Sequence, residues 1–126
     1  MTTATDTITI HLSDRAPVRI ADGAWPCIAL ASWHDGQIAC QANKVAYVRA
    51  RRHEDGRIIV YGALKSGPGG CYAGWRDSRA GYLLGRTGEE TPTDEIVRAI
   101  RRVAGAIGMT ELGDECIGDL PPVDLE

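Results

Sequence analysis

The sequence contains no phenylalanine and only two lysines, and no hydrophobic run approaches the length of a membrane span. Its N-terminus lacks the basic and apolar regions of a secretory signal, so we expect a cytoplasmic protein that does not contact a membrane. The sequence also lacks a Cys-x-x-Cys pair and a His-Glu-x-x-His motif, which argues against a metal or a cofactor. The cysteines are therefore expected to be reduced and mostly buried: Cys27, Cys40, Cys71 and Cys116.

Large aliphatic residues are scarce, because only 26 of the 126 residues are leucine, isoleucine or valine. Such a low content is typical of disorder only when net charge is high, and here the net charge is −3. We therefore expect one folded domain with a thin core, and a thin core favours association with a second copy.

Charge is unevenly distributed along the chain. Residues 44–102 carry a net charge of +5, and residues 103–126 carry −6. This pattern is typical of solvated surface with an acidic end, and it is also compatible with a basic binding face. Residues 1–108 are predicted to form the domain, and residues 109–126 an acidic, partly mobile tail.

A β-hairpin over residues 44–65 is the clearest predicted element. A turn at residues 54–56 with a left-handed Gly56 makes a three-residue loop. This loop pairs Arg49 with Tyr61 and Arg51 with Ile59, which segregates the side chains by face. One face is apolar, and the other carries Tyr47, Arg49, Arg51, His53, Arg57, Tyr61 and Lys65.

Other segments complete an α+β fold. Alternating residues 7–12 and 18–20 predict strands. Residues 22–33 favour a short helix, with a strand over 27–33 as the alternative. Residues 93–107 predict an amphipathic helix. We expect an antiparallel sheet of about four strands with one C-terminal amphipathic helix packed on one face.

The polar face of the hairpin is the first candidate binding site. Arginines neutralise phosphates and tyrosines stack on bases, so the face suits nucleic acid. The same residue types also occur on an ordinary solvated or subunit-facing sheet surface, and the acidic total charge does not favour nucleic acid. The candidate residues are Tyr47, Arg49, Arg51, Arg57, Tyr61 and Lys65.

A glycine-rich connection over residues 62–88 holds the second set of candidates, Cys71, Tyr72 and Trp75. Its glycines match neither phosphate-loop nor dinucleotide-binding spacing. Cys71 would act as a nucleophile only with a histidine base such as His34 within reach. A thiol enzyme is therefore the less favoured alternative.

Three short stretches resemble an uncharacterised group of small bacterial proteins of phage or mobile-element type. They are residues 22–26, residues 40–43, and residues 53–57 with 60–62. The resemblance implies a bacterial cytosolic accessory protein and carries no activity to any residue. The sequence as a whole favours a non-enzymatic binding or interaction module, homo-oligomeric or with a protein partner.

Overall fold

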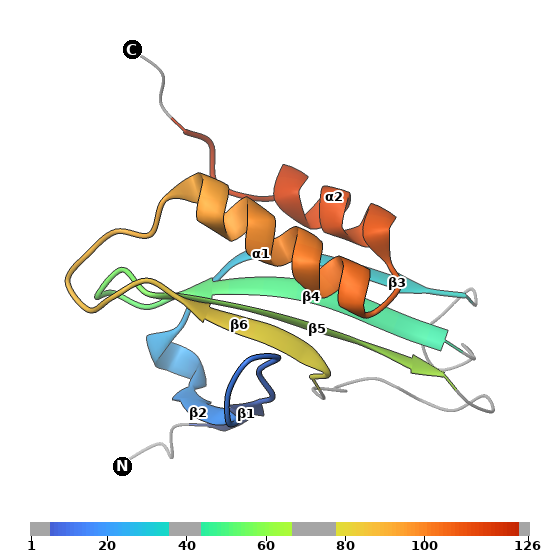
Figure 1. Ribbon diagram of the computed structural model, residues 1–126, viewed down its shortest axis with the longest axis horizontal. Coiled ribbons are helices and arrows are strands. Elements are labelled where there is room, and N and C mark those ends of the chain that lie inside the picture. Colours follow the sequence, from blue (N-terminus) through green and yellow to red (C-terminus); the bar gives the residue numbers. More distant parts are fainter. Residues whose placement is uncertain (1–5, 36–43, 67–77, 124–126) are drawn as a thin grey trace.

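The computed structural model describes residues 6–35, 44–66 and 78–123 (Figure 1). A four-stranded antiparallel sheet is formed, in spatial order, by β3 (Cys27–His34), β4 (Lys44–Arg52), β5 (Ile58–Ser66) and β6 (Ala80–Leu84). The strands β1 (Thr7–Ile10) and β2 (Val18–Ala21) pair in a separate antiparallel ribbon. The α+β class and the four-stranded antiparallel sheet are therefore confirmed, and the second sheet is an addition.

Two helices, rather than the single helix predicted, lie on one face of the large sheet (Figure 1). They are α1 (Thr93–Ala106) and α2 (Thr110–Gly118). The second helix lies where we expected a tail, and its Leu112 and Cys116 are buried in the core. These two residues lie four positions apart, so they fall on one helix face and bury together.

The hairpin prediction agrees with the structure in both turn and register. Arg49 pairs with Tyr61 and Arg51 with Ile59, as the three-residue loop requires. Gly56 has a φ of +97°, the left-handed conformation that glycine adopts most easily. Local turn chemistry therefore determines how β4 and β5 align.

The helix favoured over residues 22–33 is wrong. A single 3-10 turn spans Asp22–Ala24, and the strand β3 follows from Cys27. Trp25, Ile28, Ala29 and Ser32 have helical spacing, but pairing with β4 decides the conformation. Tertiary pairing has overridden a weak local pattern.

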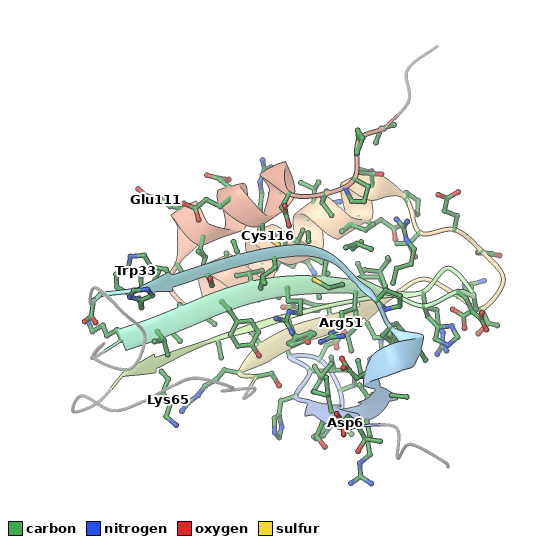
Figure 2. The ribbon with its side chains drawn as sticks, turned by 180° about the vertical axis from the view of Figure 1, so that it is seen from behind. Asp6, Trp33, Arg51, Lys65, Glu111 and Cys116 are labelled. Atoms are coloured by element: carbon green, nitrogen blue, oxygen red, sulfur yellow. The ribbon has the colours of Figure 1, made fainter. Side chains whose placement is uncertain are left out.

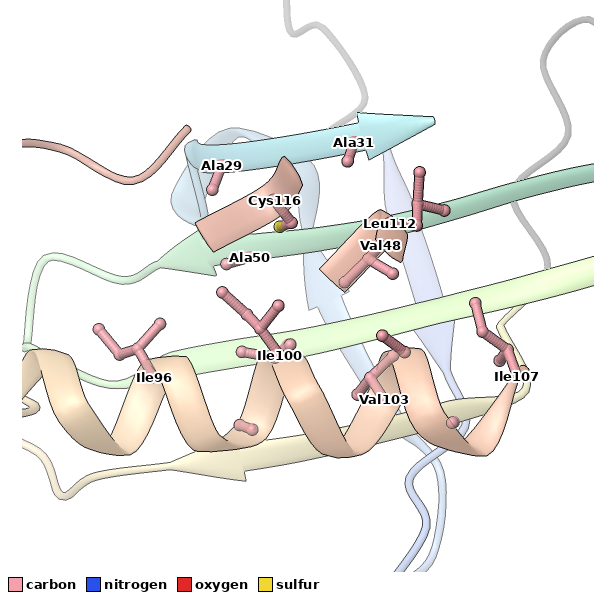
Figure 3. Close-up of a cluster of buried hydrophobic side chains, with 14 of the residues drawn as sticks. Ala29, Ala31, Val48, Ala50, Ile96, Ile100, Val103, Ile107, Leu112 and Cys116 are labelled. Carbon is pink, nitrogen blue, oxygen red and sulfur yellow. The ribbon is translucent and has the colours of Figure 1, made fainter. Parts of the chain in front are cut away.

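A hydrophobic core lies against each face of the large sheet. Between helices and sheet lies a core that includes Val48, Val60, Ile96, Ile100 and Val103 (Figure 3). A second core lies between the sheet and the β1–β2 ribbon, and it comprises Ile8, Ile10, Ile20, Trp25, Tyr47, Ile59, Tyr61 and Ala63. The ribbon thus covers part of the hairpin face that the sequence left open as free or covered.

Candidate functional site

The predicted binding face does not form one continuous surface. Tyr61 is 2% exposed, Arg51 6% and Tyr47 9%, because the ribbon and the 3-10 turn pack over them. Arg49 and Lys65 are half-buried, and Arg57 lies at the hairpin tip. The structure therefore separates the six candidates into a buried group, two half-buried cations and one residue in the turn.

Arg51 is the centre of the buried group. Its Nε donates to the hydroxyl of Tyr61 at 2.8 Å, and one terminal nitrogen donates to Asp22 Oδ1 at 2.7 Å and to the Trp25 carbonyl at 3.0 Å. Burial acts to lower the pKa of Arg51, but the contacts with Tyr61 and Asp22 outweigh it and the pKa is raised. This charged side chain fastens the 3-10 turn to the sheet and cannot contact a phosphate without breaking that network.

Arg49 lies beside the buried group rather than within it. Its guanidinium lies 5.9 Å from the centre of the Tyr47 ring, and that ring meets the Tyr61 ring edge to face at 5.9 Å. The Nε of Arg49 is buried and has no hydrogen-bond partner among the described residues. Arg49, Lys65 and Arg57 are the partly exposed cations among the six candidates, and Arg57 is already paired with Asp55. Two further cations make a small electrostatic footprint.

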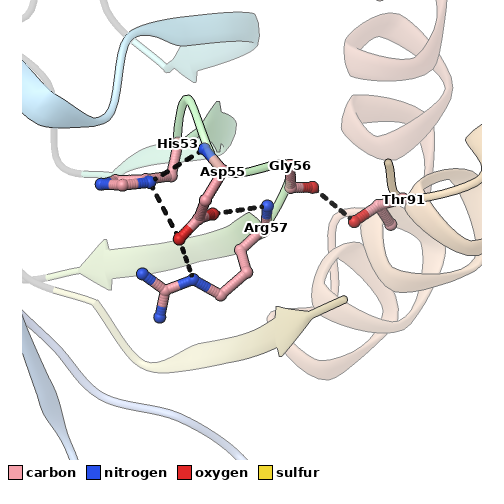
Figure 4. A network of polar contacts seen from close by, with 5 residues as sticks. All are labelled: His53, Asp55, Gly56, Arg57 and Thr91. Carbon is pink, nitrogen blue, oxygen red and sulfur yellow. Dashed lines mark hydrogen bonds and ion pairs between the residues drawn. The ribbon is translucent and has the colours of Figure 1, made fainter. Parts of the chain in front are cut away.

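The hairpin tip is held by a polar network around Asp55 (Figure 4). Asp55 accepts hydrogen bonds from the backbone N–H and the Nε of Arg57, at 3.0 and 2.8 Å, and lies 3.1 Å from His53 Nδ1. Partial burial acts to raise the pKa of Asp55, but the contacts with Arg57 and His53 outweigh it and the pKa is lowered. Thr91 adds a hydrogen bond to the Gly56 carbonyl at 2.7 Å. These contacts hold the turn between β4 and β5 in one conformation.

A cavity of about 690 Å³ lies beside this tip, between the 3-10 turn and the end of β4. Its walls are mainly apolar, with Arg52, His53 and Glu54 among the lining residues. The His53 ring lies 4.9 Å from the Trp25 ring, tilted by 52°, and the guanidinium of Arg57 lies 5.2 Å from the centre of the same indole. Within the described residues no serine, threonine or cysteine lines this cavity, so a His53–Asp55 pair lacks a nucleophile to activate.

The cysteines offer little reactive chemistry in the described part of the chain. Cys116 is fully buried, and burial, followed by the charges of Asp119 and Cys27, raises its pKa to about 12. Cys27 is exposed at the start of β3. The loop candidates Cys71, Tyr72 and Trp75, and Cys40 with them, lie outside the described residues. Among those described, no three His, Cys, Asp or Glu residues gather closely enough to hold a metal ion.

Sequence reasoning missed the outer edge of β3. Leu30 and Trp33 are 38% and 40% exposed, and the register places them on opposite faces of this strand. Figure 2 shows Trp33 near the end of β3. The Leu30 N–H donates to Asp119 Oδ2 at 2.9 Å, which shows that it points away from β4. Backbone groups alternate in direction along a strand, so those of Ser32 and His34 point outward as well. No described residue pairs with them.

The opposite edge of the sheet is closed. On β6 the outward carbonyl of Gly81 accepts from the Ser13 N–H at 2.8 Å, and the Gly81 N–H donates to the Ser13 hydroxyl at 3.2 Å. The turn between β1 and β2 thus occupies this edge. Among the described residues the sheet is therefore asymmetric: the Ser13 turn covers the centre of β6, and no partner pairs with the outer edge of β3 beyond Leu30.

One signal in the sequence marks this edge. The segment Cys27–His34 contains no lysine, arginine, aspartate, glutamate or proline, which are the residues that usually protect an edge strand. No helix in the described ranges is long and apolar enough to cross a bilayer. Comparison with family models, curated proteins and solved structures finds no match to the chain.

Proposed function

We propose that the protein is a non-enzymatic interaction module that binds an extended protein segment as an added strand along β3. The observation that carries the proposal is the open edge at Ser32 and His34, beside the exposed Trp33. In strand addition, main-chain hydrogen bonds supply affinity and alternating side chains supply specificity. The edge offers both, because Trp33 lies between the two outward-facing residues.

The absence of charged residues in β3 allows another strand to pair with its edge. Natural edge strands commonly carry a lysine, a proline or a bulge that prevents pairing with another chain. In β3 the register shift lies between Cys27 and Ala29, and the Asp119 contact closes only the Leu30 N–H. Both devices protect the first half of the strand and leave the second half open.

Nucleic-acid binding through the hairpin face has less support. The proposal from sequence used Tyr47, Arg51 and Tyr61 as stacking and phosphate-binding groups, and all three are buried. A Cys71-dependent activity and membership of a phage or mobile-element group stay predictions. No observation on the described residues bears on either.

Substitution of Ser32 by proline tests the proposal. Ser32→Pro removes an outward N–H, and a proline is accommodated on an edge where that N–H faces away from the ladder. Ser32→Ala is the matched control because it keeps the N–H. Binders are selected from a displayed library of random peptides, and self-association is measured by sedimentation on the same proteins.

We expect wild type and Ser32→Ala to bind peptide or self-associate with the same affinity. Ser32→Pro should lower that affinity by at least about tenfold. Circular dichroism and melting temperature show that the proline variant folds. If Ser32→Pro alters neither peptide binding nor self-association in the folded protein, the proposed function is wrong.

A further inference from the structure

Resting on the proposed strand addition, we propose that the segment added to β3 is the β3 strand of a second copy of this chain, antiparallel, with a twofold axis at Trp33. The two large sheets then form one continuous sheet. Three features favour the second copy and this axis: the Asp119 contact, the position of α2 and the side chain of Trp33.

The Asp119 contact selects the register. In an antiparallel pair, outward-facing residues of one strand exchange hydrogen bonds with outward-facing residues of the other. Leu30 is excluded, because its N–H is already bonded to Asp119 Oδ2 at 2.9 Å. The remaining outward-facing residues are Ser32 and His34, and they pair with His34 and Ser32 of the second copy only when the axis passes through Trp33.

Trp33 then meets its own copy across the axis. It occupies a non-hydrogen-bonded pair, where the two Cα atoms lie about 4.5 Å apart and side chains are closest. Its 40% exposure in the single chain supplies apolar area to bury. Aromatic pairs at such positions stabilise antiparallel strands.

The position of α2 favours the same axis. Leu112 and Cys116 of α2 pack over Ala29 and Ala31 (Figure 3), and Asp119 after the helix reaches Leu30. Figures 1 and 2 agree that the other end of α2 lies toward the C-terminal end of β3. With the axis at Trp33 the two α2 helices therefore lie end to end on opposite sides of it. An axis nearer Leu30 would set them side by side.

Repulsion between the acidic α2 helices of the two copies opposes dimer formation, and salt weakens this repulsion. The strand β3 carries no charged residue, so the paired backbones do not repel. The helix α2, with Asp119, carries four acidic residues and no basic one, and Glu111 is at the end nearest the axis. Glu111 of each copy thus faces the other. Self-association should strengthen with added salt, whereas binding to nucleic acid weakens.

A sealed β6 explains why the pairing is closed rather than open-ended. If β3 paired with β6 of the next copy, the chain would form filaments. Ser13 is hydrogen-bonded to both the N–H and the carbonyl of Gly81, so the centre of β6 cannot pair with another strand. The symmetric β3 pair uses the remaining open edge of the described sheet.

Disulfide trapping tests the axis. In the full chain with Cys27, Cys40 and Cys71 changed to serine, Trp33→Cys is compared with Ser32→Cys and Leu30→Cys under mild oxidation. A disulfide needs Cα atoms closer than about 7 Å, which this axis gives to residue 33 but not to residues 32 or 30. We expect a covalent dimer from Trp33→Cys alone.

Sedimentation at rising protein concentration and at two salt concentrations supplies the second measurement. We expect a reversible dimer that Trp33→Ala weakens by about tenfold and that salt or Glu111→Gln strengthens. Glu115→Gln, one turn farther from the axis, is the matched control and should have a smaller effect.

The outcomes separate the two proposals. A protein that stays monomeric at every concentration, yet binds selected peptides in a manner sensitive to Ser32→Pro, overturns the second-copy inference and leaves the proposed function standing. A cross-link that forms more readily through Ser32→Cys or Leu30→Cys overturns the axis. A dimer that is insensitive to Ser32→Pro in folded protein overturns the second-copy inference, and if peptide binding is insensitive to Ser32→Pro as well, both proposals are wrong.

Discussion

The carboxylate of Asp119 accepts a hydrogen bond from the backbone N–H of Leu30 at 2.9 Å, across a sequence separation of 89 residues. The contact ties the end of α2 to the edge of the sheet. Asp119 is at the C-cap of α2, where the helix dipole disfavours a negative charge. Its position there is compensated by the Leu30 hydrogen bond, so the two effects can be separated by mutation.

Asp119→Ala should lower the free energy of unfolding by about 1 kcal/mol, since it removes the acceptor and leaves the N–H to water. Asp119→Asn should match or exceed wild type, because the amide oxygen still accepts and the unfavourable charge is gone. Urea unfolding measures both. Asp114→Ala is the control for removal of an acidic residue from α2. An Asn variant as unstable as the Ala variant would contradict this account.

Thiol reactivity should differ sharply between the two described cysteines. Burial raises the pKa of Cys116 to about 12, so at pH 8 its thiolate is scarce and inaccessible. Cys27 is exposed. Iodoacetamide followed by peptide mass spectrometry should modify Cys27 in native protein, and Cys116 only after unfolding. Rapid alkylation of Cys116 in the native state would show that α2 does not pack as described.

The stability of the hairpin tip should depend on pH through Asp55. Its pKa is lowered in the folded state from 3.8, because its contacts with Arg57 and His53 outweigh partial burial. A carboxylate whose folded pKa is depressed contributes stability at pH values above 3.8, and this stability is lost as pH falls through the folded pKa. Asp55→Asn should therefore flatten the acid limb of a melting-temperature profile, whereas Asp14→Asn, at an exposed site, should leave it unchanged.

The sequence predicted those elements whose conformation depends on residues that are neighbours in the chain. The loop around Gly56 fixed the pairing of Arg49 with Tyr61, because turn type sets hairpin register. Ile96, Ile100 and Val103 recur at helical spacing, and all three are buried in α1. These elements depend on residues close together in the chain.

The sequence did not predict features that depend on residues far apart in the chain. Arg51 looked like an exposed cation, since its partner Asp22 lies 29 residues earlier and the ribbon that covers it is a separate sheet. Residues 22–33 favoured a helix over the alternative strand at 27–33, because the pairing with β4 that makes the strand is non-local. The open edge of β3 required the strand order, which no periodicity contains.

Arg51 should be the most sensitive polar residue in the described part of the chain. Arg51→Met keeps much of the side-chain volume and removes the donors to Tyr61, Asp22 and the Trp25 carbonyl. The Asp22 side chain is 42% exposed and can be hydrated, but the Tyr61 hydroxyl is left without its partner. We expect a loss of about 2–3 kcal/mol in the free energy of unfolding.

Two comparisons isolate the cause of that loss. Arg98→Met removes an exposed ion pair with Asp94 and should change stability by less than about 0.5 kcal/mol. Tyr61→Phe removes one hydrogen bond of the Arg51 network and should cost about 1 kcal/mol. In the double variant the two losses should not add, because both substitutions remove the same contact. Additive losses would mean that Arg51 and Tyr61 stabilise the fold independently, and that the 3-10 turn is held to the sheet by other contacts.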